Sequence, residues 1–79
     1  MNILYIEKHC PYSRKVINHM KKNNIKFELR DTDEKKHEKD LFSRSGKRQV
    51  PYLVDTNAQV EMHESNDIIE YLKTRENNK

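Results

Sequence analysis

The fold of this chain is decided by residues 2–20, which have the sequence NILYIEKHCPYSRKVINHM. Residues 2–6 contain a continuous apolar run, which is typical of a strand covered on both faces of a sheet. After a polar loop, apolar side chains recur within residues 16–20 at the spacing of one helix face. The stretch therefore predicts a central strand, a loop, and a helix that begins at Pro11 and ends before Asn23.

The middle of the chain adds a second strand and a second helix. Apolar and polar residues alternate over residues 25–30, which predicts a strand at an edge or with one wet face. Two strands joined through a helix favour a right-handed parallel pair. Residues 33–45 are highly charged, with Leu41 and Phe42 as their strongly apolar anchors. They predict a surface helix that depends on docking and ends at Gly46, and this is the weakest element.

The last part of the chain predicts a hairpin and a third helix. Residues 52–62 contain two apolar runs around a turn at residues 55–57, as in an antiparallel hairpin. Ser65 is a good N-cap for a helix that carries Asp67 near the positive end of its dipole, and residues 75–79 are expected to fray. The element order β-α-β-α-β-β-α predicts an α/β fold with a four-stranded mixed sheet flanked by helices.

Length and composition predict one small domain spanning residues 1–79. Hydrophobic residues make up 33% and charged residues 37% of the chain, so the core must be thin. No apolar run exceeds four residues, so we expect neither a membrane partner nor an export signal. The net charge of +3 comes without a basic stripe interleaved with aromatic residues, so no nucleic acid is expected. The single cysteine, Cys10, fits the reducing cytoplasm.

Cys10 is the residue that points most clearly to chemistry. Pro11 is favoured at the first position of a helix, which puts Cys10 at the N-cap. There its sulfur can accept the free N–H of Tyr12 or Ser13. The positive end of the helix dipole, with Lys8 nearby, favours the thiolate over the thiol. A small buried apolar cysteine is the structural alternative, but a strand-to-helix loop with polar neighbours favours a reactive thiol.

Four histidines are the other candidate metal ligands, namely His9, His19, His37 and His63. None of them lies at ligand spacing from Cys10, and structural zinc sites need pairs of Cys or His at set spacings. We therefore expect no metal site.

Three motifs carry a resemblance to a known family. Residues 10–13, Cys-Pro-Tyr-Ser, resemble the Cys-Pro-Tyr-Cys site of glutaredoxins, and residues 10–16 are similar to the start of the first helix in glutathione-transferase N-terminal domains. Residues 49–51, Gln-Val-Pro, resemble the Val-Pro turn before the third strand, and residues 64–69 resemble the Glu-Ser signature of the last helix. The resemblance covers essentially the whole chain. It implies a thioredoxin/glutaredoxin fold with a transferase-like glutathione site.

The resemblance implies a role for each motif residue. Cys10 is the nucleophile that attacks the glutathione sulfur, or the substrate sulfur, of a mixed disulfide. Pro51 is in the cis form, although few X-Pro bonds are. Val50 then pairs through its backbone with the cysteinyl unit of glutathione, as an added strand pairs with a sheet edge. Tyr12, counted among the glutathione-binding residues, fits either a half-buried aromatic side chain or a lid over the site.

The resemblance also places the two ends of glutathione. Ser65 binds the γ-glutamyl carboxylate with its hydroxyl and backbone N–H at a helix N-terminus. Glu64 meets the α-ammonium, and Gln49, helped by Lys47 or Arg48, reaches the glycine carboxylate. Taken singly, Ser65 also fits a simple helix cap and Glu64 a solvated charge. Because both residues occur together with the cysteine motif, in the order that the family has, the binding roles are favoured.

Two departures from the family pattern limit the activity. Ser13 replaces the second cysteine, so Cys10 has no resolving partner and a dithiol route is excluded. The remaining function is that of a monothiol enzyme, a glutathione-dependent thiol-disulfide oxidoreductase. It uses glutathione as co-substrate, acts on glutathionylated proteins or small mixed disulfides, and is expected to be a monomer. Glu7 stands where many glutaredoxins have a basic residue, which weakens the expected binding of the glycine carboxylate.

Two other functions stay open at this point. A glutathione-ligated [2Fe–2S] cluster could be held by a dimer, because cysteine thiolates are the expected cluster ligands. Relatives of that kind have Gly and Phe where Pro11 and Tyr12 stand. The chain could also be a non-catalytic domain that binds glutathione or another protein.

Overall fold

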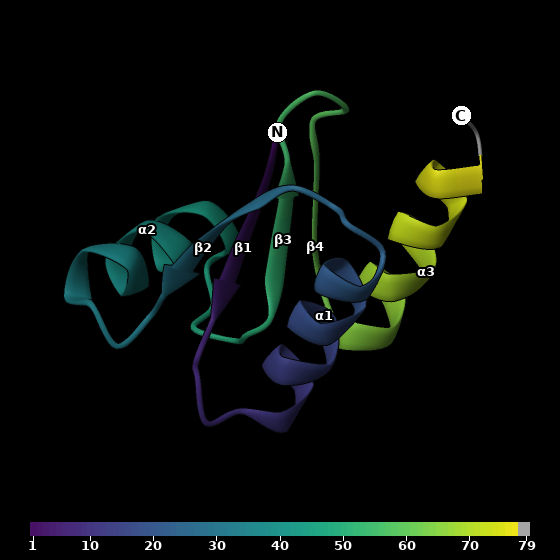
Figure 1. Ribbon diagram of the computed structural model, residues 1–79. Coiled ribbons are helices and arrows are strands. Elements are labelled where there is room, and N and C mark those ends of the chain that lie inside the picture. Colours follow the sequence, from purple (N-terminus) through teal and green to yellow (C-terminus); the bar gives the residue numbers. More distant parts are fainter. Residues whose placement is uncertain (78–79) are drawn as a thin grey trace.

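The computed structural model describes residues 1–77 and contains the seven predicted elements in the predicted order (Figure 1). The strands are β1 (Asn2–Ile6), β2 (Phe27–Asp31), β3 (Tyr52–Asp55) and β4 (Val60–His63). The helices are α1 (Pro11–Lys22), α2 (Lys35–Ser45) and α3 (Ser65–Asn77). The predicted α/β class is therefore confirmed.

The four strands form one mixed sheet in the order β2-β1-β3-β4. β1 pairs with β2 in parallel, whereas β3 pairs antiparallel with both β1 and β4. Leu4 lies opposite Leu29 on one side and Leu53 on the other. β1 is thus inside the sheet, as its continuous apolar run predicts, and β2 is an edge, as its alternating pattern predicts.

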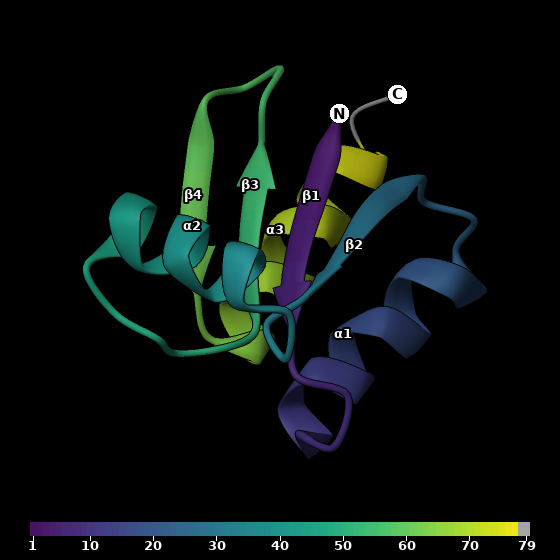
Figure 2. The same cartoon turned by 90° about the vertical axis from the view of Figure 1, so that its left-hand side faces the viewer.

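Helices cover both faces of the sheet. Figure 2 shows α2 in front of the sheet and α1 and α3 behind it. Because side chains alternate along β1, the strand contributes to two cores. The core shared with α1 and α3 consists of Leu4, Ile6, Val16, Met20, Leu53, Ile68 and Leu72. The core shared with α2 consists of Ile3, Tyr5, Leu41, Tyr52 and Val54. In the described part of the chain, no helix is long and apolar enough to cross a membrane.

The α2 helix is held mainly by polar contacts. Leu41 is fully buried, but the expected second anchor, Phe42, is 49% exposed, so that prediction is wrong. The Tyr5 hydroxyl donates a hydrogen bond to the Asp40 carboxylate instead. Arg30 Nη1 lies 3.0 Å from Asp40 Oδ2 and donates to the Tyr5 hydroxyl at 2.9 Å. A helix with few apolar residues docks here because a charged residue of its own reaches the polar end of a buried tyrosine.

Some predicted boundaries are wrong, because local backbone geometry overrides the apolar pattern. β2 does not begin at Ile25, since the Ile25 N–H donates to the Met20 carbonyl at 2.9 Å and closes the end of α1. Asp55 is the last residue of β3 rather than part of the turn, because it pairs across the hairpin. Residues 75–77 continue α3 rather than fray, and residues 78–79 lie outside the described chain.

Asp55 connects the end of β3 to the last turns of α3. Its Oδ2 accepts a hydrogen bond from the Tyr71 hydroxyl at 2.6 Å and lies 3.8 Å from Arg75 Nε. Its Oδ1 accepts from the N–H groups of Asn57 and Ala58. Burial opposes ionisation, but the hydrogen bonds from Tyr71 and Ala58 outweigh it, so the pKa of Asp55 lies below its usual value. The ionised carboxylate therefore stabilises the folded state.

Asp55→Asn should lower the free energy of unfolding by about 1–3 kcal/mol at pH 7, because it removes charge-assisted hydrogen bonds from a buried site. The lowered pKa means that this stabilisation is present above the unfolded pKa of about 3.9 and is lost as the pH falls through the folded value. Urea unfolding should therefore show a smaller difference between variant and wild type at acidic pH than at neutral pH. Asp33→Asn, at an exposed carboxylate, is the control. A difference that stays constant with pH would contradict the argument.

Candidate active site

Cys10 lies at the N-cap of α1, as predicted, in an extended conformation. The short loop from β1 is closed by the Cys10 N–H, which donates to the Glu7 carbonyl at 2.9 Å. The predicted capping bond to the sulfur is wrong, because within residues 1–77 the Cys10 side chain caps no backbone N–H. Sulfur is a weak acceptor, so the backbone forms the cap geometry without it. The half-buried Cys10 thiol therefore forms no capping hydrogen bond and lies at the positive end of α1.

Ser13 has a structural role that its place in the motif does not reveal. Its side chain is completely buried, and its Oγ accepts the Glu7 N–H at 3.3 Å. The first turn of α1 thereby fixes the start of the loop that carries Cys10. The hydroxyl that replaces the second cysteine of the family motif holds the remaining cysteine in place through this loop.

The residues expected to bind glutathione line one pocket of about 300 Å³. The walls come from the start of α1, the loop before β3 and the start of α3. The lining residues are Tyr12, Gln49, Val50, Pro51, Glu64, Ser65 and Asn66. All six predicted binding residues are thus brought together from three distant segments. The described lining does not include Cys10 itself, which lies two residues before Tyr12.

Two of the lining side chains bind each other. Gln49 Nε2 donates to Glu64 Oε1 at 2.8 Å, which joins the loop before β3 to the start of α3. The Val50–Pro51 peptide bond is cis, as the family resemblance implies. Asn66, which sequence reasoning missed, accepts a hydrogen bond from Lys15 Nζ at 2.6 Å. The only sequence signal for a place of Asn66 at the pocket was its position directly after the Glu-Ser pair.

Ser65 lies one position further into the helix than predicted. The Ile68 N–H donates to the Glu64 carbonyl at 2.9 Å, so Glu64 is the residue that precedes the helix and Ser65 is the first helical residue. Glu64 has a positive φ of 74°, so the chain turns sharply there and α3 begins at the next residue. The N–H groups at the start of α3 have no partner within the helix and lie at the pocket wall. The site keeps a donor for an anion although the cap prediction was wrong.

His63, the last residue of β4, lies next to the pocket and was not predicted to matter. Its ring packs against Tyr52 with centroids 4.5 Å apart. Burial lowers the pKa of His63, Lys47 adds to this effect, and a hydrogen bond to the Gln49 backbone opposes it. The imidazole is therefore neutral at pH 7 and adds no charge to the pocket.

The expected helpers for the glycine carboxylate do not line the pocket. Arg48 lies over the Phe42 ring, 5.3 Å from its centroid, and its Nε is 3.8 Å from Glu38 Oε1. Neither Arg48 nor Lys47 belongs to the described lining. The helper role for Lys47 or Arg48 stays a prediction, and in this structure an aromatic ring and a carboxylate of α2 hold the Arg48 guanidinium.

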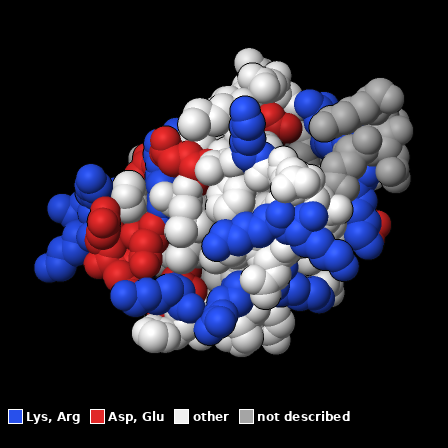
Figure 3. Space-filling view, viewed as in Figure 1, with Lys and Arg blue, Asp and Glu red and all other residues white. Residues whose placement is uncertain are grey.

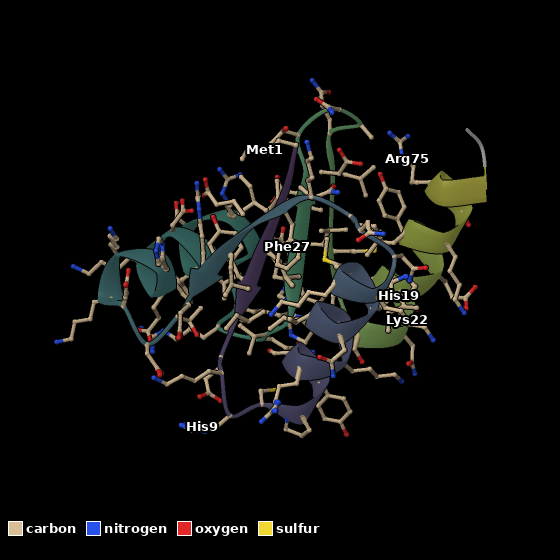
Figure 4. The ribbon with its side chains drawn as sticks, viewed as in Figure 1. Met1, His9, His19, Lys22, Phe27 and Arg75 are labelled. Atoms are coloured by element: carbon tan, nitrogen blue, oxygen red, sulfur yellow. The ribbon has the colours of Figure 1, made fainter. Side chains whose placement is uncertain are left out.

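A larger hollow of about 650 Å³ lies at the other end of the sheet. Figure 4 labels two of its lining residues, Met1 and Arg75, far from His9, the neighbour of Cys10. Its described lining contains no cysteine and no other predicted site residue. Size alone would favour this hollow, but the smaller pocket contains the predicted binding residues and begins two residues from Cys10. Among the residues that the structure describes, no three His, Cys, Asp or Glu side chains are grouped to hold a metal ion.

The fold and the place of Cys10 at the start of α1 define a domain of the thioredoxin superfamily. The family model described as the glutathione S-transferase N-terminal domain matches residues 4–79, and the chain belongs to this family. Among solved structures, the chain is similar to glutaredoxin 2 from Salmonella typhimurium in complex with glutathione. The TM-score is 0.76, with 30% identity over 91% of this chain.

The chain is also similar to a diazinon-metabolizing glutathione S-transferase of the silkworm Bombyx mori. In that comparison the TM-score is 0.75, with 25% identity over 91% of this chain. The chain spans only about a third of both structures, 32% of the glutaredoxin and 36% of the transferase. A search of curated proteins finds no match. The resemblance to glutaredoxins with a transferase-like domain is confirmed by the family and by both structures.

Ser13→Ala should lower the free energy of unfolding by about 1 kcal/mol, because the partly buried Glu7 N–H loses its acceptor. The loop before Cys10 should open more often as a result. Hydrogen exchange of the Glu7 amide, followed by NMR, should become faster than in the wild type. Ser43→Ala, at an exposed serine of α2, is the matched control. Unchanged exchange at Glu7 in the Ser13 variant would show that this hydrogen bond does not hold the loop.

Proposed function

We propose that this protein is a glutathione-dependent thiol-disulfide oxidoreductase of the glutaredoxin type, which removes glutathione from mixed disulfides through Cys10 alone. The observation that supports this function most strongly is the pocket beside Cys10, where all the residues expected to bind glutathione meet. Glutathione is the co-substrate, and glutathionylated proteins or small mixed disulfides are the substrates. A lone thiol suits the reducing cytoplasm, where we propose that the protein acts as a monomer.

In the proposed complex, glutathione lies along the pocket with its sulfur toward Cys10. The backbone of Val50 pairs with the cysteinyl unit in the manner of an added strand. The γ-glutamyl carboxylate lies at the start of α3, where Ser65 offers its hydroxyl and its N–H and the helix dipole favours an anion. The Glu64 carboxylate, held by Gln49 at 2.8 Å, faces the α-ammonium. The carboxylate and the ammonium on the γ-glutamyl α-carbon then each meet a partner of opposite charge, which fixes the orientation of this end of glutathione.

Tyr12 and Pro51 complete the proposed site. Tyr12 is 63% exposed at the pocket rim and is free to lie over bound glutathione. Pro51 is buried and forms the floor next to Val50. An exposed aromatic side chain over a buried proline can exclude water from the reacting sulfur without closing the site to a large substrate.

The proposed reaction has two exchange steps. In the first, the Cys10 thiolate attacks the glutathione sulfur of the mixed disulfide. A new S–S bond joins Cys10 to glutathione, the old S–S bond breaks, and the substrate sulfur leaves as a thiolate that takes a proton from water. In the second, the thiolate of another glutathione attacks the glutathione sulfur on Cys10. Glutathione disulfide leaves, and the Cys10 thiolate is restored.

The net reaction converts one mixed disulfide and one reduced glutathione into a free substrate thiol and glutathione disulfide. A second protein thiol is not needed, because the resolving sulfur comes from solution. This fits a chain with a single cysteine and a buried Ser13 at the position of the resolving thiol. The rate should be highest when the attacking sulfur is a thiolate at ambient pH.

Cys10→Ser should abolish turnover of a glutathionylated peptide in an assay that couples glutathione disulfide to glutathione reductase and NADPH. The hydroxyl is a far poorer nucleophile than a thiolate at neutral pH, and the chain has no other thiol. Circular dichroism should show that the variant is folded. Turnover that persists in the folded Cys10 variant would disprove the proposed function.

Ser65→Ala should raise the KM for glutathione by roughly tenfold and leave kcat nearly unchanged, because one hydrogen bond to a carboxylate is lost on binding. Ser43→Ala on α2 is the matched control and should keep the wild-type KM. An unchanged KM in the Ser65 variant, with Cys10-dependent turnover intact, would show that glutathione does not use the Ser65 hydroxyl.

A further inference from the structure

The first helix and the loops at its ends carry an uninterrupted positive charge. Residues 8–27 contain six Lys and Arg and no Asp or Glu, whereas residues 28–40 contain six Asp and Glu and four Lys and Arg. We name the six exposed cations of the first stretch the basic face. They are Lys8, Arg14, Lys15, Lys21, Lys22 and Lys26. The net charge of +3 for the whole chain therefore conceals a strong separation of charge.

Helix geometry gathers these cations on one side. Val16 and Met20 are completely buried and define the inner side of α1. At about 100° per residue, the four cations of α1 lie on the opposite, outer side. Figure 3 shows a band of Lys and Arg side chains over α1, while Asp and Glu side chains gather beside α2. The basic face is thus a continuous stripe rather than scattered charges.

The charge of this stripe is not neutralised from within. In residues 1–75, none of the six cations forms an ion pair with a carboxylate of the chain. The side chain of Lys15 instead contacts a neutral amide, with its Nζ 2.6 Å from Asn66 Oδ1. The four arginines outside this stretch do pair with carboxylates. They are Arg30, Arg44, Arg48 and Arg75. The unpaired charge of the basic face is available to an external anion.

The basic face begins at the thiol. Lys8 lies two residues before Cys10 and Arg14 four residues after it. Lys15 contacts Asn66, which lines the pocket beside Cys10. A polypeptide that brings a glutathionylated cysteine to Cys10 must lay its neighbouring residues across the surface around the start of α1. The charge of those residues then meets the basic face.

From this geometry we propose that the basic face selects acidic polypeptides, so that the preferred substrates carry Asp and Glu around their glutathionylated cysteine. The proposal rests on the proposed function, because it concerns the substrate of that reaction. Opposite charge raises the rate of encounter and orients the partner before the thiol reacts. A single-stranded nucleic acid fits less well, since Tyr12 is the one exposed large apolar side chain that the described chain provides within residues 8–27.

The test compares glutathionylated peptides of equal length whose cysteine is flanked by Glu, Gln or Lys. At low salt, kcat/KM for the Glu peptide should exceed that for the Lys peptide by about tenfold or more. The ratio should approach one near 0.5 M NaCl, where screening is strong. Similar kcat/KM values for the Glu and Lys peptides at low salt would overturn the proposal.

The double variant Lys21→Glu/Lys22→Glu should reduce the preference for the Glu peptide by about tenfold. Its turnover of a mixed disulfide between glutathione and a small neutral thiol should stay at the wild-type level, because neither lysine lies in the pocket. The matched control is Lys35→Glu/Lys39→Glu, which makes the same change of charge at exposed lysines of α2. An equal loss of preference in the control would show that net charge, not the basic face, governs selection.

Binding provides a readout that does not depend on catalysis. The Glu peptide without glutathione should shift NMR signals of α1 in the Cys10→Ser variant, and the Lys peptide should not. If turnover of every substrate fails while this binding is present, the proposed function is wrong, and the basic face stands as a docking surface for acidic polypeptides. If turnover occurs but α1 signals do not move, the surface proposal is wrong. An RNA oligonucleotide or anionic vesicles that compete as well as the Glu peptide would also overturn it.

Discussion

The burial of β1 on both faces is the constraint on which the rest of the structure depends. Ile3 and Tyr5 belong to one core, and Leu4 and Ile6 belong to the other. Each such side chain contributes roughly 1.5–3 kcal/mol when buried. A shift of one residue would exchange the two sets, so the register of β1 is fixed. The point where β1 ends is fixed with it, and the loop closed by the Cys10 N–H and the Glu7 carbonyl places the thiol at the start of α1.

The same strand explains how a weakly apolar helix is retained. Tyr5 brings a hydroxyl into a buried position, where an unpaired polar group would be costly. Burial and the hydrogen bond to Asp40 raise the pKa of Tyr5, while the hydrogen bond from Tyr5 lowers the pKa of Asp40. Both directions describe a neutral donor and an ionised acceptor. Arg30 and Arg44 bring positive charge to the same carboxylate, so α2 is held by a network that is fully paired.

Sequence patterns predicted the elements and the six pocket residues because these depend on local periodicity and on motifs with fixed spacing. They failed where contacts between residues far apart in the sequence decide the position of a side chain. Phe42 was expected in the core, but the polar anchor at Asp40 takes over its role and leaves it exposed. The contact of the Arg48 guanidinium with the Phe42 ring likewise joins two segments, and no pattern within either segment predicts it. The roles of Asn66 and His63 follow from which segments meet at the pocket, and no spacing within one segment records that.

The α1 helix divides two tasks between its two sides. Its inner side, with Val16 and Met20, is set by the core, and the buried hydroxyl of Ser13 fixes the loop that positions Cys10. Its outer side carries the exposed cations, of which Lys15 contacts Asn66 at the start of α3. In the proposed function, the chemistry of the thiol depends on the inner side and the helix start, whereas the proposed choice of partner depends on the outer side. Because the two sets of residues do not overlap, selectivity can change by surface substitution without moving the reactive sulfur.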